Sequence, residues 1–266
     1  MQDQSTIKRN ASIWRWLTVG VATYLAWAVV IVVLAMIFPI LLIIGILDRK
    51  NGYRRLKGFA FWFIEWFFLG YLPLTRLYKL VETPSKEQAC ANQPCIYVAN
   101  HRSGLDAILA FAYFPKIRIP VKKTYLDLPL LGLIIRWIGC ISFDRKDPQS
   151  IIDGVKQAEE ILAAGESLFV FPEGTRSGSD GTSMFSDVFF RVALNANVPV
   201  VPVIIHSDVP FLAPEGKSIL TRRRAAWRII VEEPLRRDKR DRPSDLSRSA
   251  RRVISKKLAS LATSKG

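Results

Sequence analysis

A long uncharged stretch near the amino terminus restricts the possible folds of this chain more than any other feature. From Trp16 to Leu47 the sequence contains no Asp, Glu, Lys or Arg, whereas a helix needs only about 20 apolar residues to cross the hydrocarbon of a bilayer. At about 1.5 Å per residue, the stretch is too long for one upright helix and too short for a comfortable hairpin of two. We therefore predict a membrane segment that Pro39 either kinks or divides.

The residues around this stretch bear on its processing and orientation. Cleavage of a signal peptide is the alternative, since Ala26-Trp27-Ala28 resembles a cleavage site, but the apolar run continues far beyond it. Fewer basic residues precede the run than follow it: Lys8, Arg9 and Arg15 against Arg49, Lys50, Arg54, Arg55 and Lys57. We therefore expect the following domain on the cytoplasmic side of a membrane, which is the inner membrane in a bacterium.

A second apolar cluster, FAFWFIEWFFLGY from Phe59 to Tyr71, is too short to span a bilayer and is rich in Phe and Trp. These side chains favour the membrane–water boundary, so we interpret the cluster as an interfacial helix that follows a basic patch. The alternative is that the aromatics belong to the core of a soluble domain. In both cases we predict a membrane-attachment module of helices at 1–75 and a second domain at 76–266.

Beyond Pro84 the hydrophobic pattern becomes that of an α/β domain. Strand-like runs are CIYVA, RIPV, CISF, SLFVF, VPVVPVII and WRIIVEE, and the segments DGVKQAEEILAAG and FFRVALNAN between them have the period of a helix. The strand-like runs show little polar alternation, which is typical of a sheet covered on both faces. We predict an α/β fold with a mixed, mostly parallel sheet flanked by helices, and active groups where strands end and helices begin.

The charge balance indicates an anionic partner. Lys and Arg number 38 against 23 Asp and Glu, a formal charge of +15, which fits nucleic acid, acidic lipid headgroups or phosphorylated small molecules and carriers. The cysteines Cys90, Cys95 and Cys140 lack metal-binding spacing, so we interpret them as small buried residues in a reducing compartment. His206, one of two histidines, is interpreted as a structural or surface residue.

The other histidine, His101, follows the strand-like run CIYVA, and Asp106 comes shortly after it. A helix that begins near Ser103 would carry Asp106 in its early turns, so the carboxylate can fold back towards the imidazole. An Asp bonded to one ring nitrogen fixes the tautomer and leaves the other nitrogen free to accept a proton. The alternative is that His101 only caps the helix while Asp106 faces solvent.

Two later segments end strands with groups suited to phosphate. GCISFDR, from Gly139 to Arg145, ends in an arginine, and FVFPEGTRSG, from Phe169 to Gly178, contains a Pro-Glu-Gly-Thr-Arg turn. Such a turn exposes main-chain N–H groups and a guanidinium together. Each segment alone is a weak signal, but their order and spacing make a strong one.

Over roughly Pro94 to Glu233 the sequence resembles the 1-acyl-glycerol-3-phosphate acyltransferase family of glycerolipid acyltransferases. The stretch NHRSGLD matches the N-H-x-x-x-x-D block of that family, and the resemblance implies His101 as the base and Asp106 as its orienting partner. The second, third and fourth blocks match Gly139 to Arg145, Phe171 to Ser177, and Val198 to Val203. The resemblance implies a substrate-binding set that comprises Lys122, Arg145, Glu173, Gly174, Thr175 and Arg176.

The resemblance also implies the reaction. A fatty acyl chain would pass from acyl-CoA or acyl carrier protein to the free hydroxyl of lysophosphatidic acid, giving phosphatidic acid for phospholipid biosynthesis. His101 would deprotonate the hydroxyl, which attacks the thioester without an acyl-enzyme intermediate, and main-chain N–H groups near the third block could stabilise the oxyanion. Donor, acceptor and membrane surface are anionic, which accounts for the basic charge. No metal, cofactor or nucleic acid is implied.

The chain departs from the family pattern after the third block. Most members carry a Phe-Lys-x-Gly segment there, whereas this chain has Phe185-Ser186-Asp187-Val188. One cation near the expected headgroup site is therefore absent and a carboxylate is added. Lysophosphatidic acid remains the expected acceptor, and the alternative is another lysolipid, such as lyso-ornithine lipid or a lysophospholipid, whose amine Asp187 could tolerate.

The carboxy-terminal region adds further positive charge. A last amphipathic helix, with Leu246, Val253, Ile254, Leu258 and Leu261 on one face, could lie on anionic lipid or could pack on the domain with a solvated basic face. A membrane-anchored basic module that binds lipid without catalysis would explain the charge and the anchor. It would not explain the His-Asp pair, the two strand-end arginines and the Glu-Gly-Thr-Arg turn together.

Overall fold

The computed structural model describes residues 18–43 and 58–71 with gaps, and then 78–85, 88, 93–114, 116–128, 131–177, 182–208, 225–236, 238 and 240–263. The basic residues that flank the first apolar run, the predicted boundary between residues 75 and 76, and Cys90 lie outside the described residues. The orientation inferred from those basic residues and the domain boundary therefore stay predictions.

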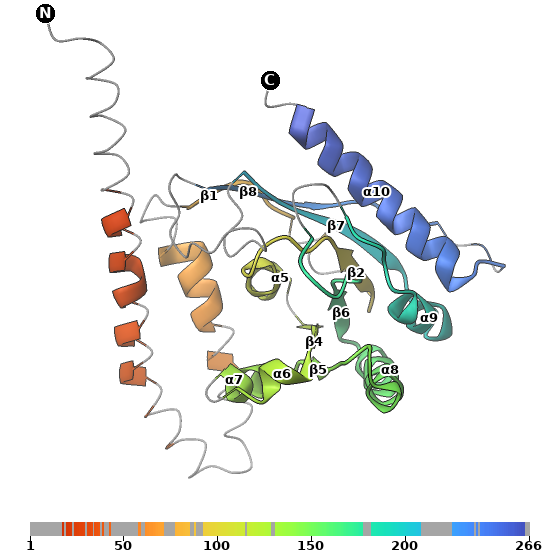
Figure 1. The fold of residues 1–266 in the computed structure, drawn as a ribbon, viewed down its shortest axis with the longest axis horizontal. Helices are drawn as coiled ribbons and strands as arrows, with labels where there is room; N and C mark the ends of the chain where they lie inside the picture. Colours follow the sequence, from red (N-terminus) through yellow and green to blue (C-terminus); the bar gives the residue numbers. More distant parts are fainter. Residues whose placement is uncertain are drawn as a thin grey trace, which may run out of the picture.

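The first apolar run contains a helix. The described residues between Thr18 and Ile43 are helical, and Gly20–Ile37, with a mean hydropathy of 2.4, is long and apolar enough to cross a membrane. Core helices and signal sequences meet the same criterion. In Figure 1 this helix, at the red end of the chain, runs along one side of the domain, and Trp27 packs against the domain core. The question of a division at Pro39 involves residues 40–42, which are not described.

The aromatic cluster is helical at Phe59 and from Trp62 to Glu65, and it continues as a π-helical turn, η1 (Trp66–Tyr71). One side of it, through Ile64 and Phe67, packs against the domain core, whereas the side chains of Trp62 and Trp66 remain 54% and 38% exposed. The Trp62 and Trp66 rings stack on each other at 6.4 Å. One face of the cluster therefore belongs to the core, and the other presents aromatic rings outward; its position at a membrane interface stays a prediction.

The domain is built on a six-stranded sheet in the order β1-β8-β7-β2-β6-β3 (Figure 1). Its strands are β1 (Tyr78–Glu82), β2 (Ile96–Ala99), β3 (Ile117–Arg118), β6 (Ser167–Val170), β7 (Val200–Ser207) and β8 (Ala225–Val231). Every neighbouring pair is parallel except β7 with β8, which is antiparallel. The predicted mixed, mostly parallel sheet is confirmed, although the pattern gave no sign of the edge strand β1.

The run RIPV does not form one strand. Ile117–Arg118 (β3) joins the large sheet beside β6, whereas β4 (Pro120–Val121) pairs with β5 (Ile141–Ser142) in a separate two-stranded sheet. Between the two pieces the carbonyl of Ile119 already accepts the N–H of Ile141, at 3.1 Å. Because Pro120 has no N–H to donate, the chain leaves the large sheet there.

Helices cover both faces of the large sheet, as the apolar strand runs predict. They are α5 (Asp106–Tyr113) on one face, and α8 (Pro148–Ala163), α9 (Val188–Asn195) and α10 (Pro243–Thr263) on the other; α6 (Lys123–Leu126) and α7 (Leu131–Ile138) pack against each other. Alternate residues of β2 enter two separate cores: Ile96 and Val98 pack with α8, α9 and α10, and Tyr97 and Ala99 pack with α5. Successive side chains of a strand point to opposite faces, so one strand anchors both layers.

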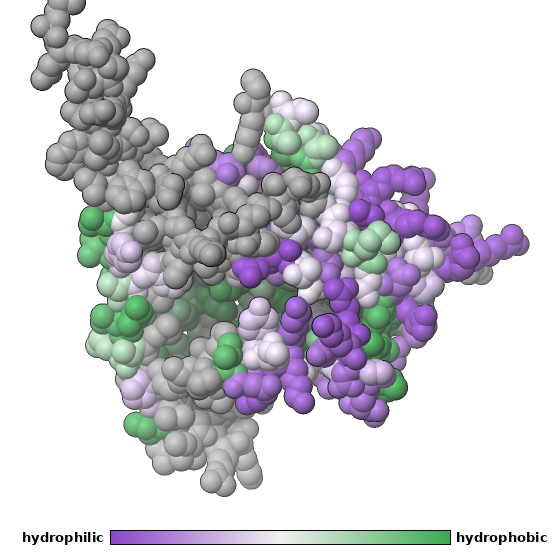
Figure 2. Space-filling model, in the orientation of Figure 1, coloured by the Kyte–Doolittle hydropathy of each residue, from purple (hydrophilic) through white to green (hydrophobic). Residues whose placement is uncertain are grey.

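The last helix, α10, packs its apolar face on the domain. Ala250 and Ile254 are fully buried in the core with α9 and β7, and Leu246 and Leu258 are buried beside them. Its basic side chains Arg248, Arg252 and Lys256 are exposed, and hydrophilic residues gather over this helix in Figure 2. Of the two interpretations of the carboxy-terminal helix, the structure supports packing with a solvated basic face.

We expect Ile254→Ala to lower the free energy of unfolding by about 3 kcal/mol, because a fully buried side chain leaves a cavity. Val253→Ala, at the adjacent and only partly buried position, should cost less than about 1 kcal/mol. Urea unfolding of the detergent-solubilised protein measures both. Equal and small losses for the two variants would contradict the packing of α10 on the domain.

Candidate active site

The site lies where β2 ends at the carboxyl edge of the sheet. The Asn100 side chain, which is fully buried, donates to the carbonyl of Ile205 at 2.8 Å and accepts the N–H of the same residue at 2.9 Å. These bonds extend the pairing of β2 with β7 beyond the last main-chain pair, Ala99 with Val203. The next residue, His101, therefore leaves the sheet from a fixed point.

His101 and Asp106 are in contact. The imidazole Nδ1 lies 2.8 Å from Asp106 Oδ2, and the same oxygen accepts the N–H groups of Arg102 and Ser103, at 2.7 Å and 2.8 Å. A carboxylate oxygen already held by two donors is an acceptor, so Nδ1 carries the proton and Nε2 is the nitrogen available to accept one. Asp106 is 1% exposed, whereas the His101 side chain is 22% exposed. The helix begins at Asp106 itself rather than near Ser103.

The third sequence block holds His101 from three directions. The N–H of His101 donates to Glu173 Oε1 at 3.0 Å, and its carbonyl accepts the N–H of Ser177 at 2.8 Å and the hydroxyl of Ser177 at 3.2 Å. The Phe171 ring stacks on the imidazole, with the ring centroids 4.4 Å apart. Main chain and ring are therefore both constrained, and the orientation of the imidazole does not depend on Asp106 alone.

Glu173 is a buried carboxylate, 2% exposed, with both oxygens occupied. Oε1 accepts the N–H of His101, and Oε2 accepts the N–H of Ser183 at 2.8 Å. A buried carboxylate is costly unless hydrogen bonds satisfy it, and here main-chain donors from two separate segments do so. Glu173 therefore connects the His101 loop to the chain that precedes α9.

Arg145 crosses from the second block to the third. Its Nη2 donates to the carbonyl of Glu173 at 2.6 Å, and its Nη1 to that of Pro172 at 3.4 Å. The guanidinium fits over Gly174, whose φ of +67° is left-handed and where a Cβ would meet Arg145 Nη2. A guanidinium has five N–H donors, so the bonds to these two carbonyls leave further N–H donors for an anionic ligand.

The remaining members of the predicted binding set lie on the same edge. Lys122 follows β4, and Phe143 donates its N–H to the carbonyl of Val121 at 2.8 Å, so Lys122 comes level with the segment that leads to Arg145. Lys122 is exposed; Thr175 is exposed and Arg176 half-buried in the turn after Gly174. The structure thus brings the first three blocks together at the carboxyl edge of the sheet, whereas the fourth, Val198–Val203, enters the amino end of β7 and pairs with β2.

Several residues that hold the site were not among those predicted. Phe171 and Ser177 belong to the third block, so their place in the motif was the available signal, but their contacts with His101 could not be inferred from it. Asn100 stands next to the histidine in the first block. Ser183 carries no sequence signal, because its contribution is a main-chain N–H.

The two thiols that the structure describes and the second histidine are not placed for nucleophilic chemistry. Burial raises the pKa of the Cys140 thiol to about 12 and raises the pKa of Cys95 as well, so both stay protonated at neutral pH. His206 is buried within β7, in register with Arg228 of β8. Among the described residues, no three His, Cys, Asp or Glu side chains form a group that could hold a metal ion.

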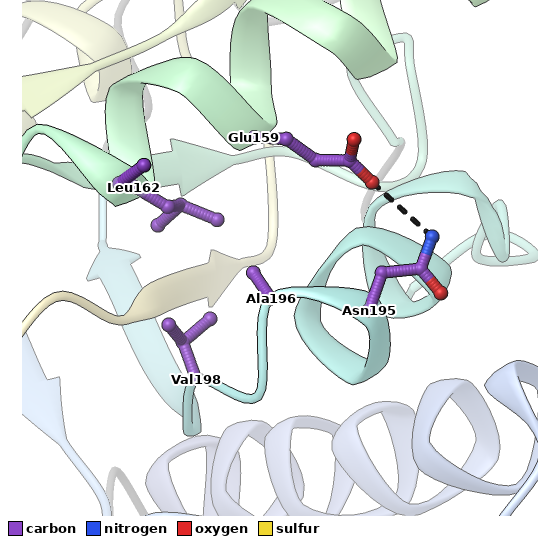
Figure 3. Close-up of a pocket in the computed structure, with 6 residues that line it drawn as sticks. Glu159, Leu162, Asn195, Ala196 and Val198 are labelled. Carbon is purple, nitrogen blue, oxygen red and sulfur yellow. Dashed lines mark hydrogen bonds between the residues drawn. The ribbon is translucent and has the colours of Figure 1, made fainter.

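A cavity of about 390 Å³ lies elsewhere (Figure 3). It is lined by the end of α8 and the turn after α9, and Glu159 and Asn195 hydrogen-bond across it at 3.2 Å. The turn after α9 leads into the amino end of β7, whereas His101 follows the carboxyl end of β2. Because β2 and β7 are parallel, the cavity and His101 lie at opposite edges of the sheet.

The fold and the site together define an α/β domain with a His-Asp pair at the carboxyl edge of its sheet. Residues 80–206 match the model of the family described as Acyltransferase. In the solved structures, PlsC from Thermotoga maritima, a 1-acyl-sn-glycerophosphate (LPA) acyltransferase, has the same fold, with a TM-score of 0.65 and 20% identity over 94% of this chain and 98% of that one.

Curated relatives of this chain are 1-acyl-sn-glycerol-3-phosphate acyltransferases. A chloroplastic enzyme of Brassica napus is 30% identical over 60% of this chain and 46% of its own length. The yeast enzyme of that name is 32% identical over 48% and 44%, and a probable one of Mycoplasma pneumoniae is 36% identical over 41% and 43%. The chain thus spans less than half the length of these relatives, and the resemblance found in the sequence is confirmed.

We expect Gly174→Ala to destabilise the protein by roughly 2 kcal/mol, because the methyl group adds backbone strain of about 1 kcal/mol and displaces the Arg145 guanidinium from its two carbonyls. In an Arg145→Ala background the same substitution should cost only the strain, so the two changes are not additive. Urea unfolding of the four variants measures this coupling. Additive losses of unfolding free energy would contradict the close packing of the Arg145 guanidinium over Gly174.

Proposed function

We propose that this chain is a 1-acyl-sn-glycerol-3-phosphate O-acyltransferase, which moves a fatty acyl chain from acyl-CoA or acyl carrier protein to the free hydroxyl of lysophosphatidic acid. The observation that carries the proposal is the Nδ1–Oδ2 contact of His101 and Asp106, with the imidazole stacked on Phe171 and its Nε2 available. The activity for which these relatives are named supports the same reaction. The product is phosphatidic acid.

A single base, His101, accounts for the proton transfers of the reaction. His101 Nε2 takes the proton of the acceptor hydroxyl while the oxygen attacks the thioester carbonyl, forming the new C–O bond. Asp106 Oδ2, held by two main-chain N–H groups, stabilises the imidazolium that forms. The intermediate then breaks its C–S bond, and the thiolate leaves with the proton from His101. Main-chain N–H groups of the third block are the candidates to stabilise the oxyanion.

The acceptor phosphate belongs near Arg145. Its clasp on the carbonyls of Pro172 and Glu173 fixes the guanidinium beside the turn that holds His101, and a planar fork suits phosphate oxygens. Arg176 and Lys122 would add positive charge on the same edge, while Glu173, Gly174 and Thr175 shape the turn. A thioester donor is also anionic, which suits a chain of formal charge +15.

The proposed place of action is a membrane surface, because the acceptor is a lipid. The apolar helix Gly20–Ile37 lies on the opposite side of the domain from α10 (Figure 1), and the rings of Trp62 and Trp66 are exposed. Apolar and aromatic side chains of this kind suit insertion and interfacial anchoring respectively. We place the catalytic domain on the cytoplasmic side.

We expect His101→Ala to abolish acyl transfer and leave membrane attachment intact, and Asp106→Asn to lower kcat on the order of a hundredfold or more through loss of the tautomer. Release of free thiol from acyl-CoA on addition of lysophosphatidic acid measures turnover. Near-normal turnover by His101→Ala would refute the proposed base. A wild-type protein that binds lipid vesicles without releasing thiol would favour a lipid-binding module instead.

Asp187 favours a second candidate acceptor. Ser186 donates its N–H to the carbonyl of Pro172 at 2.9 Å, the oxygen that Arg145 also contacts, so Asp187 lies beside the proposed phosphate site. Its side chain is exposed and makes no capping bond to α9. A carboxylate there would weaken binding of a phosphate monoester and accept the amine of lyso-ornithine lipid or of an amine-bearing lysophospholipid.

A side-by-side comparison of acceptors with one acyl-CoA decides between them. If lysophosphatidic acid is the acceptor, we expect it to rank first and Arg176→Ala to raise its Michaelis constant roughly tenfold, through loss of a charged hydrogen bond. Asp187→Asn should lower that constant. A higher kcat/KM for an amine-bearing lysolipid, together with an unchanged constant in Arg176→Ala, would replace lysophosphatidic acid by the second candidate.

A further inference from the structure

The guanidinium of Arg251, on α10, contacts the segment Thr182–Met184, which lies directly before the buried Phe185. Its Nη2 donates to the carbonyl of Thr182 at 3.0 Å, its Nε contacts Thr182 Oγ1 at 3.4 Å, and its Nη1 contacts Met184 Sδ at 3.3 Å. Ser255, one turn further along α10, pairs its hydroxyl with Thr182 Oγ1 at 2.8 Å. One guanidinium therefore holds the segment on both sides of Ser183.

These contacts fix the position of the Ser183 N–H, which is one of the two donors to the buried carboxylate of Glu173. Between Thr182 and Met184, Ser183 donates its N–H to Glu173 Oε2 at 2.8 Å, and the other oxygen of Glu173 accepts the N–H of His101. The far end of the segment is also fixed, because Phe185 is buried and Ser186 donates to Pro172. Hydrogen bonds, joined by the backbone of Thr182–Met184, thus connect the last described helix to the main chain of the catalytic histidine.

We propose that Arg251 is a positioning residue for acyl transfer, which acts through Ser183 and Glu173 to hold the His101 loop in its productive geometry. Arg251 contacts neither member of the His-Asp pair. Without it, Ser183 is no longer held on Glu173, the buried carboxylate loses one of its two donors, and its bond to the N–H of His101 loosens. The inference rests on the proposed function, since the geometry that Arg251 would preserve is the one that acyl transfer needs.

A positioning role predicts an effect on turnover rather than on binding. Arg251→Ala should lower kcat about tenfold, the size expected for loss of a charged hydrogen bond that acts at one remove, with the Michaelis constants for acyl-CoA and lysophosphatidic acid within about twofold of wild type. Arg145 and Lys122, on other segments, still supply the anion contacts. Steady-state kinetics of the full chain in mixed micelles measure both constants.

Two matched variants isolate the contacts that matter. Arg252→Ala removes the same charge from the adjacent position of α10, where the side chain is exposed, and should leave kcat unchanged. Lys256→Ala removes one positive charge from another exposed position of α10 and should also leave kcat unchanged. A fall in kcat of similar size in Arg252→Ala would overturn the proposal, because net charge would then explain the effect.

A double-mutant cycle tests the path itself. If Arg251 acts through Glu173, adding Arg251→Ala to Glu173→Gln should lower kcat by less than twofold further, whereas independent residues would multiply their losses. Hydrogen exchange supplies a readout without turnover: in Arg251→Ala the amides of His101 and Ser183 should exchange faster, while those of β2 stay protected.

The outcomes separate this inference from the proposed function. If the wild type transfers acyl chains but Arg251→Ala keeps its kcat, raises only a Michaelis constant, or loses only thermal stability, the positioning role is wrong. If kcat falls but the cycle with Glu173→Gln is multiplicative, the path through Glu173 is wrong. If the wild type transfers no acyl chain to any lysolipid, the proposed function fails, and faster exchange at His101 would still show the coupling of α10 to the site.

Discussion

The arrangement of this site depends on the buried carboxylate of Glu173. Removing a carboxylate from water is unfavourable unless donors replace the water, and within the described residues both donors are main-chain N–H groups, from His101 and Ser183. Each donor belongs to a segment without regular structure, so the carboxylate sets the distance between two loops that no strand or helix aligns. The sheet brings the loops to one edge, and Glu173 fixes their separation.

The His-Asp pair, by contrast, is assembled locally. Asp106 begins α5, and its Oδ2 accepts the N–H groups of Arg102 and Ser103 in the turn that precedes the helix, so bonds within one short segment position the carboxylate. The longer-range contacts, the Phe171 stack and the two bonds from Ser177, then fix the imidazole relative to the rest of the site. Local bonds set which nitrogen is protonated, and tertiary bonds set where the other nitrogen points.

This division explains what could be predicted from the sequence. The His-Asp contact was predictable because few residues separate the two, and the sheet was predictable because its strands are apolar on both faces. The separation of RIPV between two sheets at Pro120 was not predictable, because it depends on a distant donor: the carbonyl of Ile119 accepts the N–H of Ile141. The contacts of Arg251 and Ser183 could not be found, since they join segments far apart in the chain, and one of them uses only the backbone. The roles of the site residues remain proposals.

The bonds of Arg145 to two carbonyls would serve both stability and the proposed binding of a phosphate. A free arginine side chain loses considerable rotamer entropy when it closes on a phosphate. Here the carbonyls of Pro172 and Glu173 already hold Nη1 and Nη2, so that loss occurs on folding rather than on binding. The close approach requires a residue without Cβ at position 174, because an alanine there would occupy the place of Nη2. The glycine of the turn is therefore needed for the cation as much as for the left-handed backbone.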